Sequence, residues 1–261
     1  MSGPLQLPAP IRRERLYFST IAPDARQTAL DLGAGLELAY FCTASNMDEG
    51  FAKYDPPARQ DCAAVKRKLF HAPFNELCPA AIDPKARDLA RFRYLQAARL
   101  AASYGIGGMV AHSGFIPLIY YEEWFLEESV KFWTSILGEL PPGMTLYIEN
   151  VLEDGPELLG ALARAVNHPR FRLCLDVGHA NVAPSRKPLS LWLEACGPHL
   201  EHFHLHNNTG AWDTHSGLGE GSMELSAFLR QAAALRPNAT FTVETLSAAR
   251  DGAWLAEQKL I

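Results

Sequence analysis

The stretch EHFHLHNN, residues 201–208, places a histidine at every second position. His202, His204 and His206 alternate with two apolar residues, Phe203 and Leu205. Successive side chains of an extended strand point to opposite faces, so a strand here would direct all three imidazoles to one face. Three histidines on one face favour a functional site over a set of structural residues, but the alternation does not indicate which of them act.

Further short apolar runs along the chain predict strands of the same kind. Longer stretches with helical periodicity lie between most of them, and the clearest covers residues 83–105. There Asp83 suits the N-cap, Pro84 suits the first turn and Gly105 can end the helix. Further helices are expected over 122–137, 156–166 and 225–235. With residues 202–206, the predicted strands are 16–21, 35–41, 68–71, 108–112, 145–150, 171–176 and 240–245.

This alternation of eight strands with helices, in a chain of 261 residues, predicts an α/β protein folded as a single (β/α)8 TIM barrel. A doubly wound open sheet is the alternative. It usually has fewer strands, and the glycine-rich nucleotide fingerprint is absent after the first strand, where the sequence reads STIAPDAR. We therefore expect one barrel domain over residues 1–261, with an irregular segment at 1–15.

The composition limits the class of protein. The chain is 48% hydrophobic and 20% charged with a net charge of −5, which fits a globular protein and lacks the basic character of nucleic-acid binders. The five cysteines are scattered without a C-x-x-C pair, which argues against a disulfide framework and a cysteine zinc site. No signal-peptide or membrane-spanning run occurs. We expect a cytoplasmic protein.

Histidine or carboxylate side chains stand at the ends of six consecutive predicted strands. In barrels the C-terminal strand ends form the rim on which active sites are built. Each residue alone is as well explained by helix capping or ion pairing, but the set together favours a divalent-metal site. Imidazole and carboxylate without thiolate suit zinc, manganese, iron or cobalt. The residues are His71, His112, Glu149, Asp176, His179, His204, Asp213, His215 and Glu244.

Seven short motifs follow one another between residues 68 and 245: FHAPF, VAHSG, YIENV, CLDVGHAN, HLHNN, DTHSGLGEG and TVET. Each motif is weak evidence alone. In this order and spacing the set resembles the motifs of the xylose-isomerase-like TIM-barrel superfamily. That superfamily includes sugar isomerases and epimerases as well as endonuclease IV-type AP endonucleases.

The resemblance implies roles for individual side chains. His179 matches a substrate contact of the epimerases and a ligand of a further zinc ion in the endonucleases. The four ligands of the metal site shared across the superfamily are matched by Glu149, Asp176, His204 and Glu244. The remaining positions of the trinuclear endonuclease site are matched by His71, His112, Asp213 and His215.

The first functional hypothesis is a metal-dependent isomerase or epimerase of a sugar or sugar phosphate. One Mn or Zn ion would hold two adjacent substrate oxygens and stabilise an enediolate. Glu149 and Glu244 would lie on opposite sides of the substrate, one removing a proton and the other returning it. His179 would polarise a substrate oxygen.

The alternative is a multinuclear zinc phosphoester hydrolase of endonuclease IV type, with up to three zinc ions and all nine positions in use. DNA is a disfavoured substrate because the rim loops HAPFNELCPAAID and HSGFIPLIYYEEW contain no Lys or Arg for phosphate contacts. Phe74 in the first loop is followed by Asn75 and Glu76, which do not suit insertion into a duplex. A catalytically inactive binding barrel is a third and weaker hypothesis, since every ligand type is retained.

The remaining candidates surround this set. The motif aligns on His204, so His202 is expected deeper in the barrel as a hydrogen-bonded interior residue. His206 lies nearer the mouth and, with Phe74 and Phe115, is a candidate substrate contact, although packing explains Phe115 equally well. We expect a small-molecule substrate, no nucleic acid and no membrane partner, and leave a homo-oligomer open.

Overall fold

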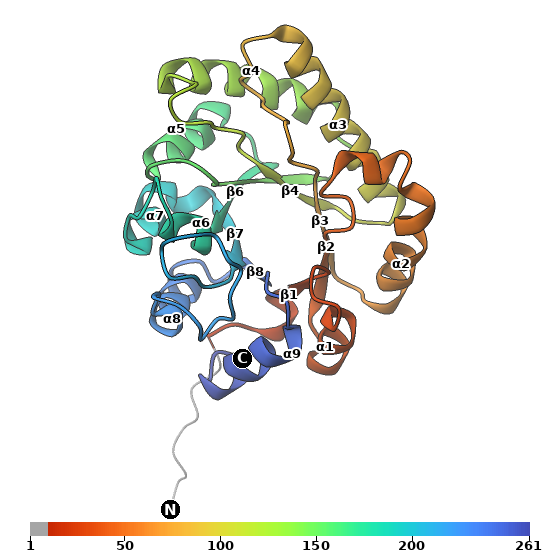
Figure 1. Ribbon diagram of the computed structural model, residues 1–261, viewed down its shortest axis with the longest axis vertical. Coiled ribbons are helices and arrows are strands. Elements are labelled where there is room, and N and C mark those ends of the chain that lie inside the picture. The colour runs from red at the N-terminus through yellow and green to blue at the C-terminus, as the bar shows by residue number, and fades with distance from the viewer. Residues whose placement is uncertain (1–9) are drawn as a thin grey trace, which may run out of the picture.

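The computed structural model describes residues 10–261, in which parallel strands close into a barrel in sequence order, with β1 hydrogen-bonded to β8 (Figure 1). The TIM-barrel prediction is confirmed, and the predicted strands match the observed ones to within about two or three residues at their ends. The strands are β1 (Leu16–Ser19), β2 (Gly35–Leu38), β3 (Lys68–His71), β4 (Gly108–His112), β5 (Thr145–Glu149), β6 (Phe171–Asp176), β7 (Leu200–Leu205) and β8 (Thr240–Val243).

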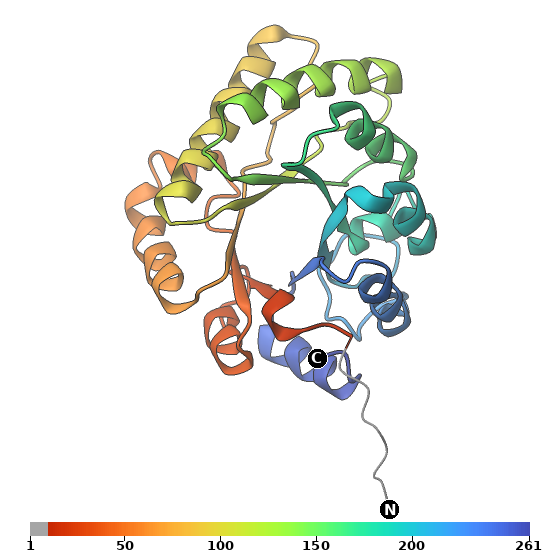
Figure 2. The same ribbon diagram turned by 180° about the vertical axis from the view of Figure 1, so that it is seen from behind.

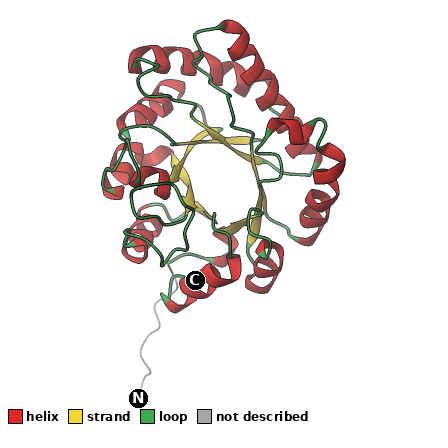
Figure 3. Cartoon of the chain, viewed as in Figure 1, coloured by secondary structure: helices red, strands yellow, loops and turns green. Residues whose placement is uncertain are grey.

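Helices surround the barrel on all sides, as the views from the front and from behind show (Figures 2 and 3). Within residues 10–261, no helix combines the length and the apolar composition needed to cross a membrane. The helices are α1 (Ala25–Leu32), α2 (Phe51–Ala64), α3 (Pro84–Ser103), α4 (Glu122–Glu139), α5 (Glu157–Val166), α6 (Val177–Asn181), α7 (Leu189–Cys196), α8 (Leu225–Leu235) and α9 (Ala248–Glu257).

The four predicted helices correspond to α3, α4, α5 and α8. The start of α3 follows the predicted capping chemistry, because the side chain of Asp83 accepts a hydrogen bond from the backbone N–H of Lys85 at 2.8 Å. In contrast, α2 was not predicted. It holds Pro56 and Pro57 in its interior, and prolines there remove backbone donors and normally interrupt a helix.

The N-terminal part of the predicted irregular segment, residues 1–9, lies outside the described residues. Residues Arg13–Arg15 form a single 3-10 turn that leads into β1. The backbone N–H of Ile11 donates to the carbonyl of Leu260 at 2.9 Å, so the two ends of the described chain meet. Asp24, which precedes α1, accepts hydrogen bonds from the first N–H groups of α9 and joins the first helix to the last.

The strand β7 follows the predicted alternation. Phe203 points outward to the helix layer and packs against Phe228 of α8, with ring centroids 6.1 Å apart. His202 and His204 point inward, where both lie within hydrogen-bond distance of Glu37 on β2. The register of the barrel also brings ligand-type residues side by side, because His112 pairs with Glu149 and Asp176 pairs with His204.

Candidate functional site

Glu149 occupies the centre of the rim and is surrounded by histidines from four strand ends. Its Oε2 lies 3.3 Å from Nε2 of His71 and 3.5 Å from Nε2 of His112. Its Oε1 lies 3.3 Å from Nδ1 of His179 and 3.4 Å from Nδ1 of His204. Burial alone would raise the pKa of Glu149, but His204 and His112 hold it well below its usual range. The carboxylate is therefore ionised.

The four residues of the expected shared metal site converge on one atom, Nδ1 of His204. This nitrogen lies 3.4 Å from Glu149 Oε1, 3.4 Å from Glu244 Oε2 and 3.9 Å from Asp176 Oδ2. All four side chains are buried. The barrel thus brings together, at one point, one imidazole nitrogen and three carboxylate oxygens that are far apart in the sequence.

This donor set fits a divalent metal ion. Nδ1 of His204 and Oε2 of Glu149 are buried and have no hydrogen-bond partner in the part of the chain that the structure describes, which is rare for buried polar atoms. The other nitrogen of His204 faces Glu37, whose carboxylate can only accept, so Nε2 carries the proton. A ring that binds a metal through Nδ1 keeps its proton on Nε2 and offers the Nδ1 lone pair on the side where the three carboxylate oxygens gather. A cation between them, of the kind that imidazole and carboxylate bind, would satisfy every atom.

A second group of ligand-type side chains lies beside the first. Oδ2 of Asp213 lies 3.3 Å from Nε2 of His179 and 3.2 Å from Nε2 of His215. Burial opposes the charged form of His215, but the hydrogen bond that its ring donates to Asp213 and the nearby carboxylates raise its pKa to about 9. By contrast, burial lowers the pKa of His112 to about 3. The structure therefore gathers all nine predicted positions around one rim.

Local hydrogen bonds hold the ligand-bearing loops. Asp176 ends β6 and caps α6, because its Oδ1 accepts from the backbone N–H of His179 at 2.7 Å. The side chain of Asn150 accepts from the backbone N–H of Asp176 at 2.8 Å and donates to its carbonyl at 3.0 Å. The motifs YIENV and CLDVGHAN are thus tied to each other, which fixes the relative positions of Glu149, Asp176 and His179.

A cavity of about 640 Å³ opens over this set. Among the residues 10–261 that the structure describes, neither Lys nor Arg lines it. Seven of the nine site residues line it: His71, His112, Glu149, His179, Asp213, His215 and Glu244. Apolar side chains that follow β1, β2, β3, β5 and β8 line it as well: Ile21, Ala39, Phe74, Val151 and Leu246.

Comparison with known proteins places this architecture. Residues 41–261 match the family described as xylose isomerase-like TIM barrel. The chain belongs to this family. An uncharacterized protein of Methanocaldococcus jannaschii is 26% identical over 187 residues, which cover 67% of this chain and 63% of that protein. The chain thus matches less than two thirds of the length of this relative.

Solved structures of the xylose isomerase-like fold superpose along almost the whole chain. A protein from Thermus thermophilus, soaked with zinc chloride, is 27% identical with a TM-score of 0.73, covering 95% of this chain and 98% of its own. A D-tagatose 3-epimerase-like protein is 19% identical with a TM-score of 0.72, covering 94% and 96%. An IOLI protein with a bound zinc atom is 15% identical with a TM-score of 0.73, covering 94% and 96%. The last two show likeness of fold.

Three predicted substrate contacts differ in their placement in this xylose isomerase-like barrel. Phe74 lines the cavity and stacks on His112, with ring centroids 4.3 Å apart. Phe115 does not line it, because its ring packs against Phe125 at 5.1 Å in a small apolar cluster. The packing interpretation of Phe115 therefore describes its position, away from the residues that line this cavity.

His206 also departs from its predicted place. Its strand ends at Leu205, and the imidazole is buried beneath the ring of His215, with centroids 4.0 Å apart. Its Nε2 lies 3.0 Å from Oδ1 of Asp176. The side chain contacts a carboxylate of the site and is not among the residues that line the cavity, and its role as a substrate contact stays a prediction.

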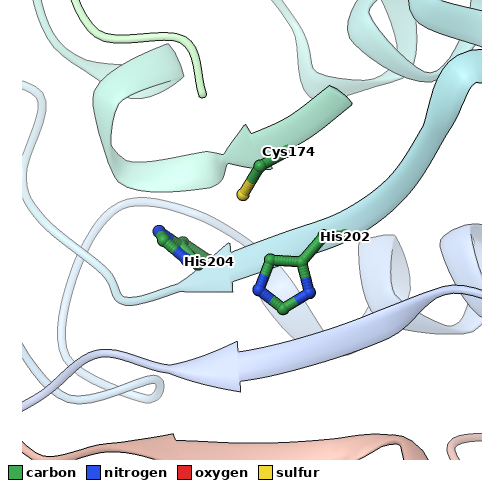
Figure 4. Close-up of side chains that lie close together, drawn as sticks. All are labelled: Cys174, His202 and His204. Carbon is green, nitrogen blue, oxygen red and sulfur yellow. The ribbon is translucent and has the colours of Figure 1, made fainter. Parts of the chain in front are cut away.

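Below the rim lies a second set of polar side chains, and the sequence predicted only part of it. Cys174, His202 and His204 lie side by side on β6 and β7 (Figure 4). Both nitrogens of His202 are engaged, with Nδ1 2.7 Å from the Thr240 hydroxyl and Nε2 3.2 Å from Glu37. His202 therefore has no free nitrogen for a metal and lies in the interior, as expected. Glu37 was missed, although an acidic residue inside the apolar run GLELAYF is an available signal.

Proposed function

We propose that this protein is a metal-dependent isomerase or epimerase that moves a proton next to a carbonyl group of a small sugar. The observation that carries the proposal is the position of two carboxylates. Oxygen atoms of Glu149 and Glu244 each lie 3.4 Å from the same nitrogen of His204, and both residues line the one cavity. A substrate held there would have two carboxylates within reach.

The proposed reaction assigns a task to each side chain. A divalent ion, Mn or Zn, would supply Lewis-acid stabilisation of negative charge on two adjacent substrate oxygens. The residues that would hold it are Glu149, Asp176, His204 and Glu244. One of the two glutamates removes the proton from the carbon beside the carbonyl, and the other returns one. His179 would polarise a substrate oxygen from the cavity wall; its Nδ1 lies 2.9 Å from the carbonyl oxygen of Asn150 and its Nε2 lies 3.3 Å from Oδ2 of Asp213.

The cavity favours an uncharged sugar over a sugar phosphate. A phosphate group is commonly held by Arg or Lys, and neither lines the cavity in the described chain. The carboxylates of Glu149, Asp213 and Glu244 border it and would repel an anion. The same reasoning disfavours nucleic acid. A single domain over residues 1–261 and a cytoplasmic location belong to this proposal, and the oligomeric state is left to experiment.

One specific observation supports a second candidate, a multinuclear zinc phosphoester hydrolase. Two further groups of side chains could each hold a metal ion, because the ligand atoms within each group lie within 4.8 Å of one another. One comprises His71, His112 and Glu149, and the other comprises His179, Asp213 and His215. Two or three ions held there would activate water and neutralise a phosphoester.

Solvent isotope exchange and metal counting test the two candidates together. The protein loaded with Mn is incubated with uncharged ketohexoses and ketopentoses in deuterium oxide, and proton NMR follows the carbon-bound hydrogen beside the carbonyl. We expect deuterium to enter that position, and about one tightly bound ion per chain. Two or three zinc ions together with hydrolysis of bis(p-nitrophenyl) phosphate, and no exchange into any ketose, would overturn the isomerase in favour of the hydrolase.

A further inference from the structure

Glu37 is a carboxylate in the interior of the barrel. It lies on β2 and is fully buried, and it contacts side chains of β7. Two strands, β1 and β8, separate β2 from β7 in the closed sheet, so these contacts cross the interior of the barrel. A buried carboxylate is costly unless hydrogen bonds compensate for the loss of water. The partners of Glu37 therefore indicate why it is retained.

Three donors converge on the two oxygens of Glu37. Oε1 accepts from Nε2 of His204 at 3.0 Å. Oε2 accepts from the hydroxyl of Thr242 at 2.6 Å and from Nε2 of His202 at 3.2 Å. The ring of His202 is in turn held by Thr240, whose hydroxyl lies 2.7 Å from Nδ1. The carboxylate is thus fixed on both oxygens and cannot turn away from His204.

We propose that Glu37 is a positioning residue for the metal-binding nitrogen of His204. Because the carboxylate accepts the hydrogen bond from Nε2–H, a metal-binding His204 keeps its proton on Nε2 and its lone pair on Nδ1, the atom that faces Glu149 and Glu244. Carboxylates that accept from the far nitrogen of a histidine ligand fix its tautomer and ring orientation and raise its basicity. The inference rests on the proposed metal site, on which Glu37 would act through His204.

A purely structural role predicts a different arrangement. Both nitrogens of His202 are paired, so this ring has none left for a metal. His204 has one nitrogen paired with Glu37, and its other nitrogen, which faces the carboxylates of Glu149 and Glu244, has no hydrogen-bond partner within residues 10–261. The asymmetry between these neighbouring histidines of β7 is what assigns Glu37 a role in metal binding beyond stability.

The substitution Glu37→Gln tests the proposal, because it keeps the size of the side chain and removes its charge. Titration calorimetry with Zn or Mn on the metal-free protein should show affinity about 10–100-fold weaker than in the wild type. The matched control is Asp61→Asn. Asp61 is a buried carboxylate that accepts from the Tyr40 hydroxyl at 2.6 Å and pairs with Arg26 at 3.1 Å, away from the site. The control should keep wild-type metal affinity.

A spectroscopic measurement decides the matter even if Glu37→Gln does not fold. Nitrogen-15 NMR of the wild-type protein reports which nitrogen of His204 carries the proton when metal is bound. A proton on Nε2 supports the proposal, and a proton on Nδ1 overturns it. Unchanged metal affinity in folded Glu37→Gln also overturns it. If the wild-type protein binds Zn or Mn tightly but no ketose exchanges deuterium, the proposed reaction fails while the role of Glu37 stands.

Discussion

Two polar layers lie one above the other in the same barrel, and they differ in how completely their atoms are paired. In the lower layer, Glu37 accepts from three donors and both nitrogens of His202 are engaged. In the upper layer, Nδ1 of His204 and Oε2 of Glu149 are buried and have no hydrogen-bond partner among the described residues. Burial is similar in both layers. The difference teaches that buried charge alone does not indicate a ligand site, whereas unpaired imidazole and carboxylate atoms that face one another leave room for a cation.

The largest effect is expected from removing the central charge of the upper layer. Glu149→Gln should lower turnover by about 10²–10⁴-fold, because it removes both a metal ligand and a proton acceptor. Steady-state kinetics on an exchanging ketose measures it. Glu153→Gln is the matched control: Glu153 is a buried carboxylate that accepts from the backbone N–H of Val151 at 2.7 Å and should leave most turnover intact. Substantial activity in Glu149→Gln would refute the site assignment.

Metal removal should affect the upper layer alone. The bound ion satisfies atoms that are otherwise unpaired, so a chelator should lower the free energy of unfolding. The metal-free protein should be about 2.7 kcal/mol less stable than the protein in a solution whose metal concentration is one hundred times the dissociation constant. Thermal unfolding with and without EDTA measures the change, and Glu149→Gln should show a smaller response. Equal melting temperatures in the two conditions would mean that the unpaired atoms do not bind metal.

The lower layer should respond as a structural unit. Thr242→Val keeps the shape of a buried side chain and removes a hydroxyl that donates to Glu37. We expect the free energy of unfolding of the metal-free protein to fall by about 1–3 kcal/mol, the cost of leaving a buried charged acceptor short of a donor. Urea unfolding measures it. The matched control is Thr209→Val at an exposed position, which should change the free energy of unfolding by less than about 0.5 kcal/mol. An equally small loss in Thr242→Val would contradict the conclusion that Glu37 depends on this hydroxyl.

The smallest effect concerns a carboxylate outside both layers. Asp24 accepts from the backbone N–H groups of Ala248 at 2.9 Å and Ala249 at 3.0 Å. Partial burial would raise the pKa of Asp24, but these hydrogen bonds favour the ionised carboxylate and lower the pKa below its usual value. A lowered pKa stabilises the fold above the unfolded value, about 3.9, and this contribution is lost as pH falls through the folded pKa. Asp24→Ala should cost about 1 kcal/mol at pH 7. Denaturant unfolding should show the wild type and variant converging in acid, and a pH-independent difference would contradict the assignment.

The sequence determined the elements and the chemistry of the rim. Strand alternation is a local property, so the eight strands and the inward direction of His202 and His204 could be predicted from spacing alone. The ligand types followed because residues at the C-terminal ends of parallel strands must share one rim. Local patterns also misled in places: Pro56 and Pro57 concealed a helix that the packed barrel tolerates.

Only the tertiary structure decided which of these side chains face a ligand. The contact between Glu37 and His204 joins residues that are 167 positions apart and lie on strands that do not pair, so no spacing in the sequence encodes it. His206 follows the same alternation as His204, yet it turns to Asp176 beneath His215 because β7 ends before it. Pairing of buried polar atoms depends on barrel closure, and closure is what separates the structural layer from the layer that can bind metal.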